Sequence, residues 1–201
     1  MSTPGIFVTG TDTGVGKTVV SGLLISAIRD WKGQVGYFKP VQTGSDSDTQ
    51  TIAQLTGLNP PSLAVPVYEF PEPIAPHRAA SLHGAHIEIE KIQSAWESLP
   101  NNFWIVEGAG GICTPLSNTT QILDIPKALE LPIVIVAASR LGTINHTLLT
   151  YQQARAKGLR VLGIIVTGEE DPELVNYLKK DLDLPAISKS EIPTWLKGVL
   201  Q

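Results

Sequence analysis

Five short runs along the chain are apolar at almost every position, rather than at alternate positions. They cover residues 6–9, 35–38, 103–106, 133–136 and 161–166. A strand with one wet face alternates apolar and polar residues, whereas a strand covered by helices on both faces is apolar throughout. The runs therefore predict a mostly parallel sheet that is buried between two layers of helices.

The segments between these runs have the spacing of helices, with apolar residues recurring every three or four positions. They cover residues 17–33, 87–99, 121–131, 143–157 and 172–182. Residues 64–83 are less regular and hold four closely spaced prolines, so we expect a loop-rich connection in which a helix resumes near Pro76. Strands that alternate with helices imply right-handed crossovers and a doubly wound α/β fold.

Length and composition are those of one globular domain. The 201 residues are 42% hydrophobic and 17% charged, which is enough apolar material for a core and too little charge for a disordered chain. We therefore expect a single domain over residues 1–201. The net charge of −4 and the lack of a basic stripe argue against nucleic acid as a partner.

Cysteine content and the first residues bear on the cellular location. The single cysteine, Cys113, excludes an internal disulfide and fits a reducing compartment. The sequence begins without a basic segment followed by a long apolar run, so we expect no secretory signal. No apolar stretch is long enough to span a bilayer. These features predict a cytoplasmic protein with no membrane partner.

The segment from Gly10 to Thr18, with the sequence GTDTGVGKT, follows the first apolar run and opens the first helical pattern. Backbone N–H groups of a small-residue loop can converge on an anion at this place, helped by the positive end of the helix. In a phosphate loop, Lys17 would reach the β- and γ-phosphates and Thr18 would offer its hydroxyl to Mg²⁺. Thr11 stands where the first glycine of the common pattern falls, so we expect a variant loop. The alternative is a glycine-rich turn with an incidental lysine.

Charged residues follow two other runs at the same edge of the predicted sheet. Glu107 ends the run at 103–106 and precedes a glycine-rich segment, so it would face the crevice where open α/β sheets bind ligands. It could hold Mg²⁺ or be an ordinary acid at a strand end. Asp48 could also hold the ion, but it could equally cap the next helix, and Asp46 competes with it. Lys39 would direct a second cation into the crevice, unless it is simply solvated.

Five blocks of the sequence stand in a fixed order within residues 5–193. They are residues 10–18, Lys39-Pro40-Val41 with Gly44 and Ser47-Asp48, Pro76-His77, Val106-Glu107-Gly108-Ala109-Gly110-Gly111 with Thr114-Pro115-Leu116, and Leu141-Gly142 with Ile144-Asn145-His146. Together these blocks resemble the dethiobiotin synthetase family. The phosphate loop alone is shared with a larger superfamily of nucleotide-binding proteins, so the set of five carries the resemblance.

The resemblance implies a P-loop NTPase-like fold and a ligase of biotin biosynthesis. Members of the family close the ureido ring of dethiobiotin from 7,8-diaminopelargonic acid, CO₂ and ATP with Mg²⁺. One amine is carboxylated to a carbamate, whose oxygen attacks the γ-phosphate to give a carbamic–phosphoric anhydride. The second amine then attacks the anhydride carbon, and phosphate leaves. No covalent enzyme intermediate is needed, so catalysis would consist of positioning and charge stabilisation.

The resemblance also implies roles for residues at matching positions. The catalytic residues would be Lys39, Lys17 and Thr13. The metal ion would be held by Thr18, Asp48 and Glu107. The residues implied in nucleotide binding are Gly14, Val15, Gly16, Lys17, Thr18, Val19, Asp48, Glu107, Gly108, Ala109, Gly110, Thr167, Gly168, Pro193, Thr194 and Trp195. Those implied in binding the diamine are Thr43, Gly111, Gly142, Asn145 and Tyr177.

The resemblance extends to a partner subunit and to the base of the nucleotide. In the family the substrate tail lies at a dimer interface, which implies a homodimer here. Tyr177 matches a tyrosine that reaches the tail across that interface, and it could equally be a packing residue. Family members that favour adenine often carry Asn-Asp where this chain has Thr167-Gly168. Threonine cannot both donate to and accept from a base edge as asparagine does, so the base selectivity stays open.

Three alternatives share the loop or the fold. A partition-type ATPase, which switches between monomer and dimer, would carry a lysine where this chain has Asp12. A non-catalytic nucleotide-binding module would leave Lys39 and Glu107 without a use. A cobyrinate-type amidating enzyme would need a glutaminase domain that 201 residues cannot also hold.

Overall fold

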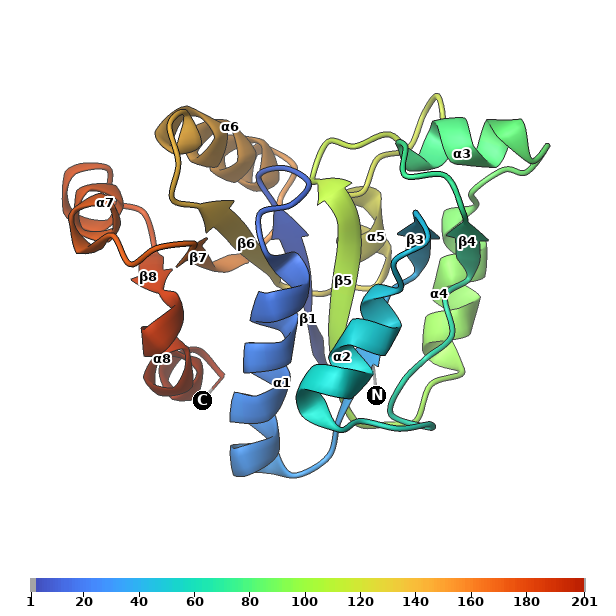
Figure 1. The fold of residues 1–201 in the computed structure, drawn as a ribbon, viewed down its shortest axis with the longest axis horizontal. Coiled ribbons are helices and arrows are strands. Elements are labelled where there is room, and N and C mark those ends of the chain that lie inside the picture. The colour runs from blue at the N-terminus through green and yellow to red at the C-terminus, as the bar shows by residue number, and fades with distance from the viewer. Residues whose placement is uncertain (1–2, 201) are drawn as a thin grey trace.

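The apolar runs form the centre of a six-stranded sheet with the order β2-β5-β1-β6-β7-β8 (Figure 1). The computed structural model describes residues 3–200; residues 1, 2 and 201 of the predicted domain lie outside that range. The strands are β1 (Gly5–Gly10), β2 (Val35–Phe38), β5 (Phe103–Gly111), β6 (Ile133–Ala138), β7 (Val161–Thr167) and β8 (Ala186–Ser188). Every neighbouring pair is parallel, which confirms the predicted sheet.

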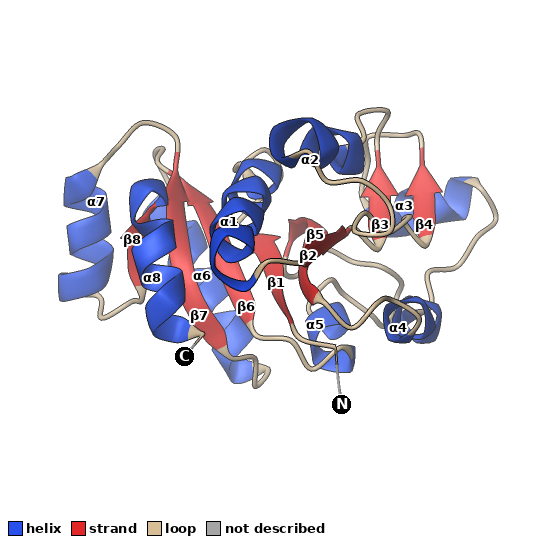
Figure 2. Ribbon diagram, turned by 90° about the horizontal axis from the view of Figure 1, so that it is seen from below, coloured by secondary structure: helices blue, strands red, loops and turns tan. Residues whose placement is uncertain are grey.

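Helices cover both faces of this sheet, so the predicted doubly wound α/β fold is confirmed (Figure 2). One face is covered by α1 (Lys17–Lys32), α2 (Asp48–Thr56) and α8 (Ile192–Val199). The other is covered by α4 (Ile89–Glu97), α5 (Asp124–Ala128) and α6 (Thr143–Ala156), with α7 (Pro172–Asn176) beside the edge strand β8. Within residues 3–200, none of the helices combines the length and apolarity needed to cross a membrane.

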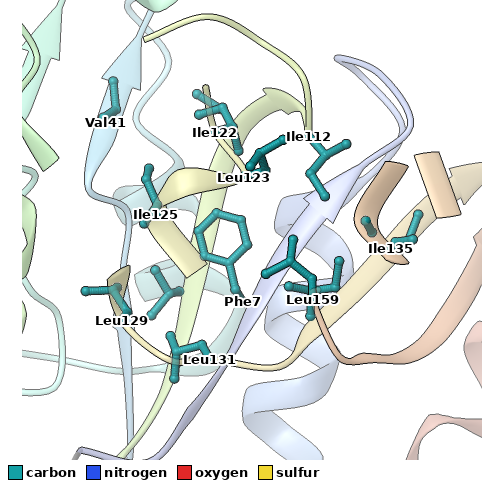
Figure 3. Packing of buried hydrophobic residues seen from close by; sticks show 14 of the residues in the cluster. Phe7, Val41, Ile112, Ile122, Leu123, Ile125, Leu129, Leu131, Ile135 and Leu159 are labelled. Atoms are coloured by element: carbon teal, nitrogen blue, oxygen red, sulfur yellow. The ribbon is translucent and has the colours of Figure 1, made fainter. Parts of the chain in front are cut away.

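Successive residues of β1 face opposite layers, as the two-residue period of a strand requires. Ile6 and Val8 belong to the core between the sheet and α1, whereas Phe7 belongs to the core on the other face. Figure 3 shows Phe7 among side chains that include Ile125 and Leu131. Full burial of a side chain of this size contributes about 1.5–3 kcal/mol. The strand is therefore packed from both sides.

The region predicted as a loop-rich connection contributes to a small second sheet. In this sheet β3 (Val41–Thr43) pairs in parallel with β4 (Tyr68–Phe70), and α3 (Pro76–Leu82) follows. The helix begins at Pro76, as predicted, because proline at the first helical position gives up no hydrogen bond. The two strands were not predicted, since three residues are too few to show a periodic pattern.

Other elements differ from the sequence-based prediction in length or kind. β5 continues through Gly108, although the glycine-rich sequence there is typical of a loop. A Cβ at residue 108 would lie only 2.9 Å from Phe7 Cζ, so glycine is what allows the strand to pass this close to the Phe7 ring. The helix predicted over 121–131 is only the short α5, and that predicted over 172–182 turns into a π-helical segment, η1 (Tyr177–Asp181). Neither β8 nor α8 was predicted.

Candidate active site

The loop between β1 and α1 lies at the carboxyl edge of the sheet, beside the end of β5 (Figure 1). Gly14 and Gly16 have positive φ angles of 72° and 91°, which glycine adopts without strain. Gly16 is the N-cap of α1, and no side chain of the described residues caps that end, so its N–H groups can receive an anion. The buried Lys17 donates to the backbone oxygen of Asp12 at 2.9 Å. This local structure is that of a phosphate loop.

Two carboxylates converge on the hydroxyl of Thr18 beside this loop, and one ammonium pairs with both of them. Thr18 Oγ1 lies 2.7 Å from Asp48 Oδ1 and 3.1 Å from Glu107 Oε1, so two carboxylates share its single proton. Lys39 Nζ lies 3.1 Å from Glu107 Oε1 and forms a second ion pair with Asp48. Segments that are far apart in the sequence thus bring a hydroxyl, two carboxylates and an ammonium into one cluster. Hydroxyl and carboxylate oxygens are ligands that Mg²⁺ prefers.

Secondary-structure elements of the main sheet and its helices position each member of this cluster. Thr18 lies in the first turn of α1, Lys39 directly follows β2, and Glu107 lies in the neighbouring strand β5. Asp48 is the first residue of α2, but the N-cap of that helix is Ser47, whose hydroxyl accepts from a backbone N–H at 3.3 Å. The capping role considered for Asp48 falls to Ser47, so the Asp48 carboxylate is free to join the cluster.

Two residues that the sequence did not single out hold the second oxygen of Glu107. Ser21 Oγ donates to Glu107 Oε2 at 2.8 Å, and Tyr37 OH donates to the same atom at 3.0 Å. Both donors are fully buried. The signal that could have found them is spacing: Ser21 lies one helical turn after Thr18, and Tyr37 lies two residues before Lys39. Each therefore shares a face with a predicted site residue.

Burial and charge shift the pKa values of three groups in the site. Burial acts to lower the pKa of Lys39, but the charges of Glu107 and Asp48 outweigh it and raise that pKa above its usual value. Burial lowers the pKa of Lys17, whose ammonium has exchanged water for a neutral carbonyl. Burial, followed by the charge of Glu107, raises the pKa of Tyr37 well above its usual value. The Tyr37 hydroxyl thus remains a proton donor.

A cavity of about 580 Å³ opens over this cluster, within the usual size of a small-molecule site. Residues 73–75, between β4 and α3, and Pro76 at the start of α3 line it as well. The predicted site residues that line it are Thr13, Gly14, Gly16, Lys17, Thr18, Val19, Lys39, Thr43, Asp48, Glu107, Ala109 and Gly110. Asp46, the alternative to Asp48, is exposed and does not line the cavity, and neither do Val15, Gly108 and Gly111.

Residues predicted to bind the base lie outside this cavity. Thr167 ends β7, and its buried hydroxyl donates to the carbonyl of Val15 at 2.6 Å, which ties the phosphate loop to the strand. Gly168 follows with a φ of 91° and is exposed. The single proton of the Thr167 hydroxyl is already donated to the Val15 carbonyl, so it is not available to a nucleotide base.

The last predicted nucleotide-binding residues belong to α8. Trp195 packs over Gly163 of β7 so closely that a Cβ on that glycine would lie 2.5 Å from the indole ring. Pro193 and Thr194 are exposed in the first turn, and Pro193 lines a second cavity of about 480 Å³ between α1 and α8. Trp195 therefore packs against the sheet, whereas Pro193 borders the cavity between α1 and α8.

Two of the residues predicted for the substrate tail lie at the start of α6, and a third, Tyr177, lies on η1. Gly142, with a φ of 91°, is the N-cap of that helix, and Asn145 is exposed in its first turn. Leu141 is fully exposed, Leu149 is 58% exposed, and Tyr177 on η1 is 42% exposed. Each of these side chains is open to solvent, in contrast to the buried cluster.

Comparison with known proteins places these features in a family. The sequence matches the family described as "AAA domain" over residues 4–194. The ATP-dependent dethiobiotin synthetase BioD of Bacillus velezensis is 43% identical over 169 residues, which cover 81% of this chain and 72% of that protein. The BioD protein of Methanococcus vannielii is 40% identical over 87% of this chain and 84% of its own length.

Solved structures agree on the fold. The ParA family ATPase of Chlorobium tepidum superposes with a TM-score of 0.55 at 12% identity, covering 100% of this chain and 94% of that one. The signal recognition particle receptor FtsY of Elizabethkingia anophelis superposes with a TM-score of 0.56 at 16% identity, covering 96% and 65%. At such low identity these likenesses speak for the architecture alone.

Fold, loop and carboxylate cluster together define a P-loop nucleotide-binding protein of the doubly wound α/β class. Within that class, the identity with the curated relatives extends over more than four fifths of the chain. The chain belongs to the dethiobiotin synthetase family, which confirms the resemblance carried by the five sequence blocks.

Proposed function

We propose that this chain is an ATP-dependent dethiobiotin synthetase, which converts 7,8-diaminopelargonic acid, CO₂ and ATP into dethiobiotin, ADP and phosphate. Membership of the family supports this activity. The observation that carries the proposal is the convergence of two lysines, Lys17 and Lys39, with an oxygen-rich cluster on one cavity.

The reaction gathers negative charge at one place, and this sets the demand on the protein. The nitrogen of one amine bonds to the carbon of CO₂ and loses a proton, which gives a carbamate. A carbamate oxygen then bonds to the γ-phosphorus while the bond from that phosphorus to ADP breaks. Finally, the second amine bonds to the carbamate carbon and loses a proton, and the bond from that carbon to the phosphate oxygen breaks. Each stage needs cations close to the transferring group.

Lys17 and Lys39 can supply that positive charge. They are only 7% and 4% exposed, so their charges act in a medium of low dielectric constant. Lys17 would bind the β- and γ-phosphates, and Lys39 would stabilise the carbamate and the transferring phosphoryl group. Thr13, which lines the same cavity, would contact the diamine or its carbamate.

The same cluster fits a magnesium ion. Thr18, Asp48 and Glu107 present hydroxyl and carboxylate oxygens, which are hard ligands, beside the phosphate loop. Among residues 3–200 no three His, Cys, Asp or Glu side chains form a metal site on their own, so phosphate oxygens would complete the coordination, as is usual for Mg²⁺. The ion would offset part of the triphosphate charge when bound. Lys39 balances the same two carboxylates here, so ion and ammonium would share them.

The far end of the diamine would lie toward α6. Thr43 and the glycines at 110–111 would border its amines, and the N–H groups at Gly142–Asn145 would receive its carboxylate. Tyr177 would reach this tail from a second copy of the chain in a homodimer. The exposed Leu141 and Leu149 support such an interface, since large apolar side chains gain by being covered. The proposed setting is the cytoplasm.

ATP is the proposed phosphoryl donor, with the base lying toward Gly168 and the start of α8. The Thr167 hydroxyl is held by the Val15 carbonyl, so it has no proton to offer a base. Backbone groups would then recognise the base, and we expect other nucleoside triphosphates to serve as donors to some extent.

Phosphate release from Mg-ATP and bicarbonate, with and without 7,8-diaminopelargonic acid, tests the proposed activity. We expect release only when the diamine is present, together with dethiobiotin detected by mass spectrometry. Release that does not depend on the diamine would instead indicate a switch ATPase. Tight nucleotide binding without release would indicate a non-catalytic module.

A further inference from the structure

We propose that Ser21 and Tyr37 are positioning residues for the metal ion, which act by fixing the carboxylate of Glu107 with one oxygen directed to the cavity. This inference rests on the proposed metal site and deepens it. Neither residue belongs to the set that the sequence or the family resemblance points to.

The two oxygens of Glu107 have separate sets of partners. Oε1 faces Thr18 and Lys39, both at 3.1 Å, on the side of the cavity. Oε2 accepts from Ser21 at 2.8 Å and from Tyr37 at 3.0 Å, on the side of the core. The four contacts therefore fix the plane of the carboxylate, with one of its two equivalent oxygens toward the cavity. Turning the plane by a quarter of a rotation would break contacts at both oxygens.

Burial makes these contacts matter. Glu107 is 1% exposed and both Ser21 and Tyr37 are 0% exposed, so water cannot replace a lost donor at Oε2. Loss of either hydroxyl would leave a buried carboxylate oxygen short of a donor and would free the carboxylate to rotate.

The fold explains why these two residues meet Glu107. Ser21 follows Thr18 by three residues on α1, so both hydroxyls point to the same side of the helix. Tyr37 lies in β2 beside Ile105 of β5, and Glu107 lies on the same face of β5 as Ile105. The donors thus come from a helix and a strand that are both packed in the core, which suits a positioning role.

Groups that orient a metal ligand affect metal affinity about 10- to 100-fold when they are removed. We therefore test Tyr37→Phe and Ser21→Ala, each of which deletes a single oxygen atom. The probe is Mn²⁺, titrated into the protein–ADP complex and followed by electron paramagnetic resonance. This measurement of Mn²⁺ binding needs no turnover, so it stays informative even if the protein does not form dethiobiotin. The proposed positioning role can therefore fail or hold independently of the proposed activity.

The matched control is Thr9→Val in β1. Thr9 is fully buried, and its hydroxyl has no partner among the residues of the described chain. It lies on the face of the sheet opposite to Glu107, because Val8 of the same strand is the residue level with Glu107. This variant also loses a buried oxygen but leaves the carboxylate untouched, so we expect unchanged Mn²⁺ binding.

We expect each of the two test variants to weaken Mn²⁺ binding about tenfold or more, with ADP binding in the absence of metal unchanged. Affinity within about twofold of the parent in both variants would overturn the inference. Loss of the folded state in both would overturn it too, because the hydroxyls would then serve the fold and not the ion.

Discussion

The two halves of the proposed active site differ in how completely one chain builds them. In the phosphate half, Lys17, Lys39 and Glu107 are buried, and each forms hydrogen bonds within the chain. In the tail half, Leu141 is fully exposed and Tyr177 is 42% exposed. The charged groups are thus held in place within one chain, whereas the residues proposed to recognise the substrate's far end are open to solvent.

The cost of burying charge explains this difference. A buried charge that lacks a partner destabilises a protein by several kcal/mol, so the fold must pair Lys39 with Glu107 and Asp48. An exposed leucine has no comparable penalty, and a second copy of the chain can cover it. Substitutions in the phosphate half should therefore act on turnover, and those in the tail half on substrate binding.

The largest effect is expected from Lys17→Ala. No other side chain in the cavity would replace the contact of this ammonium with the transferring phosphate, so turnover should fall below detection. Diamine-dependent phosphate release measures it, with the melting temperature as a check that the variant folds. A folded variant with turnover near that of the parent would show that the phosphate half does not depend on this lysine.

Lys39→Ala should lower kcat about 10²- to 10³-fold, because a preorganised cation beside the transferring group is lost. The variant also leaves Asp48 and Glu107 without their shared cation, so the metal-free protein should melt at a lower temperature. Lys197→Ala, an exposed lysine on α8, is the control. If kcat stayed near normal while stability fell, Lys39 would be a structural residue.

Glu107→Gln should raise the Mg²⁺ concentration for half-maximal activity about tenfold or more, since an amide oxygen is a weaker ligand than a carboxylate. A Mg²⁺ titration of diamine-dependent phosphate release provides the measurement. Glu97→Gln, at the exposed end of α4, should leave the titration unchanged. An unaltered titration for Glu107→Gln would remove this residue from the metal site.

The smallest effect is expected in the tail half. Tyr177→Ala should raise KM for the diamine about twofold to tenfold, the range of one net hydrogen bond, and leave kcat nearly unchanged. Steady-state kinetics with varied diamine checks this, and Tyr177→Phe separates the hydroxyl from the ring. A loss of kcat instead would mean that the two halves are not as independent as their burial indicates.

Sequence reasoning located the phosphate half because its signals are local. The apolar runs at 6–9, 35–38 and 103–106 became β1, β2 and the first part of β5, and these parallel strands run toward one edge of the sheet. The sequence therefore placed Lys39 and Glu107 beside the loop, although β5 continues to Gly111 and Glu107 lies within it. The roles of these residues in binding and catalysis remain predictions.

What the sequence missed depends on tertiary contacts. Ser21 and Tyr37 look like ordinary helix and strand residues, and only the packing of α1 against β2 and β5 brings their hydroxyls to one carboxylate. The edge strand β8 has three residues, too few for a pattern. Spacing alone left Asp48 between capping and metal binding, and the family resemblance favoured metal binding. The structure gives the cap to Ser47.

A crystal structure with Mg²⁺, a non-hydrolysable ATP analogue and 7,8-diaminopelargonic acid would put the whole arrangement to the test. The account predicts the ion on the oxygens of Thr18, Asp48 and Glu107, with the Lys17 and Lys39 ammonium groups both against the terminal phosphate and an amine of the diamine beside them. An ion bound elsewhere, or a Lys39 ammonium turned out of the cavity, would contradict it.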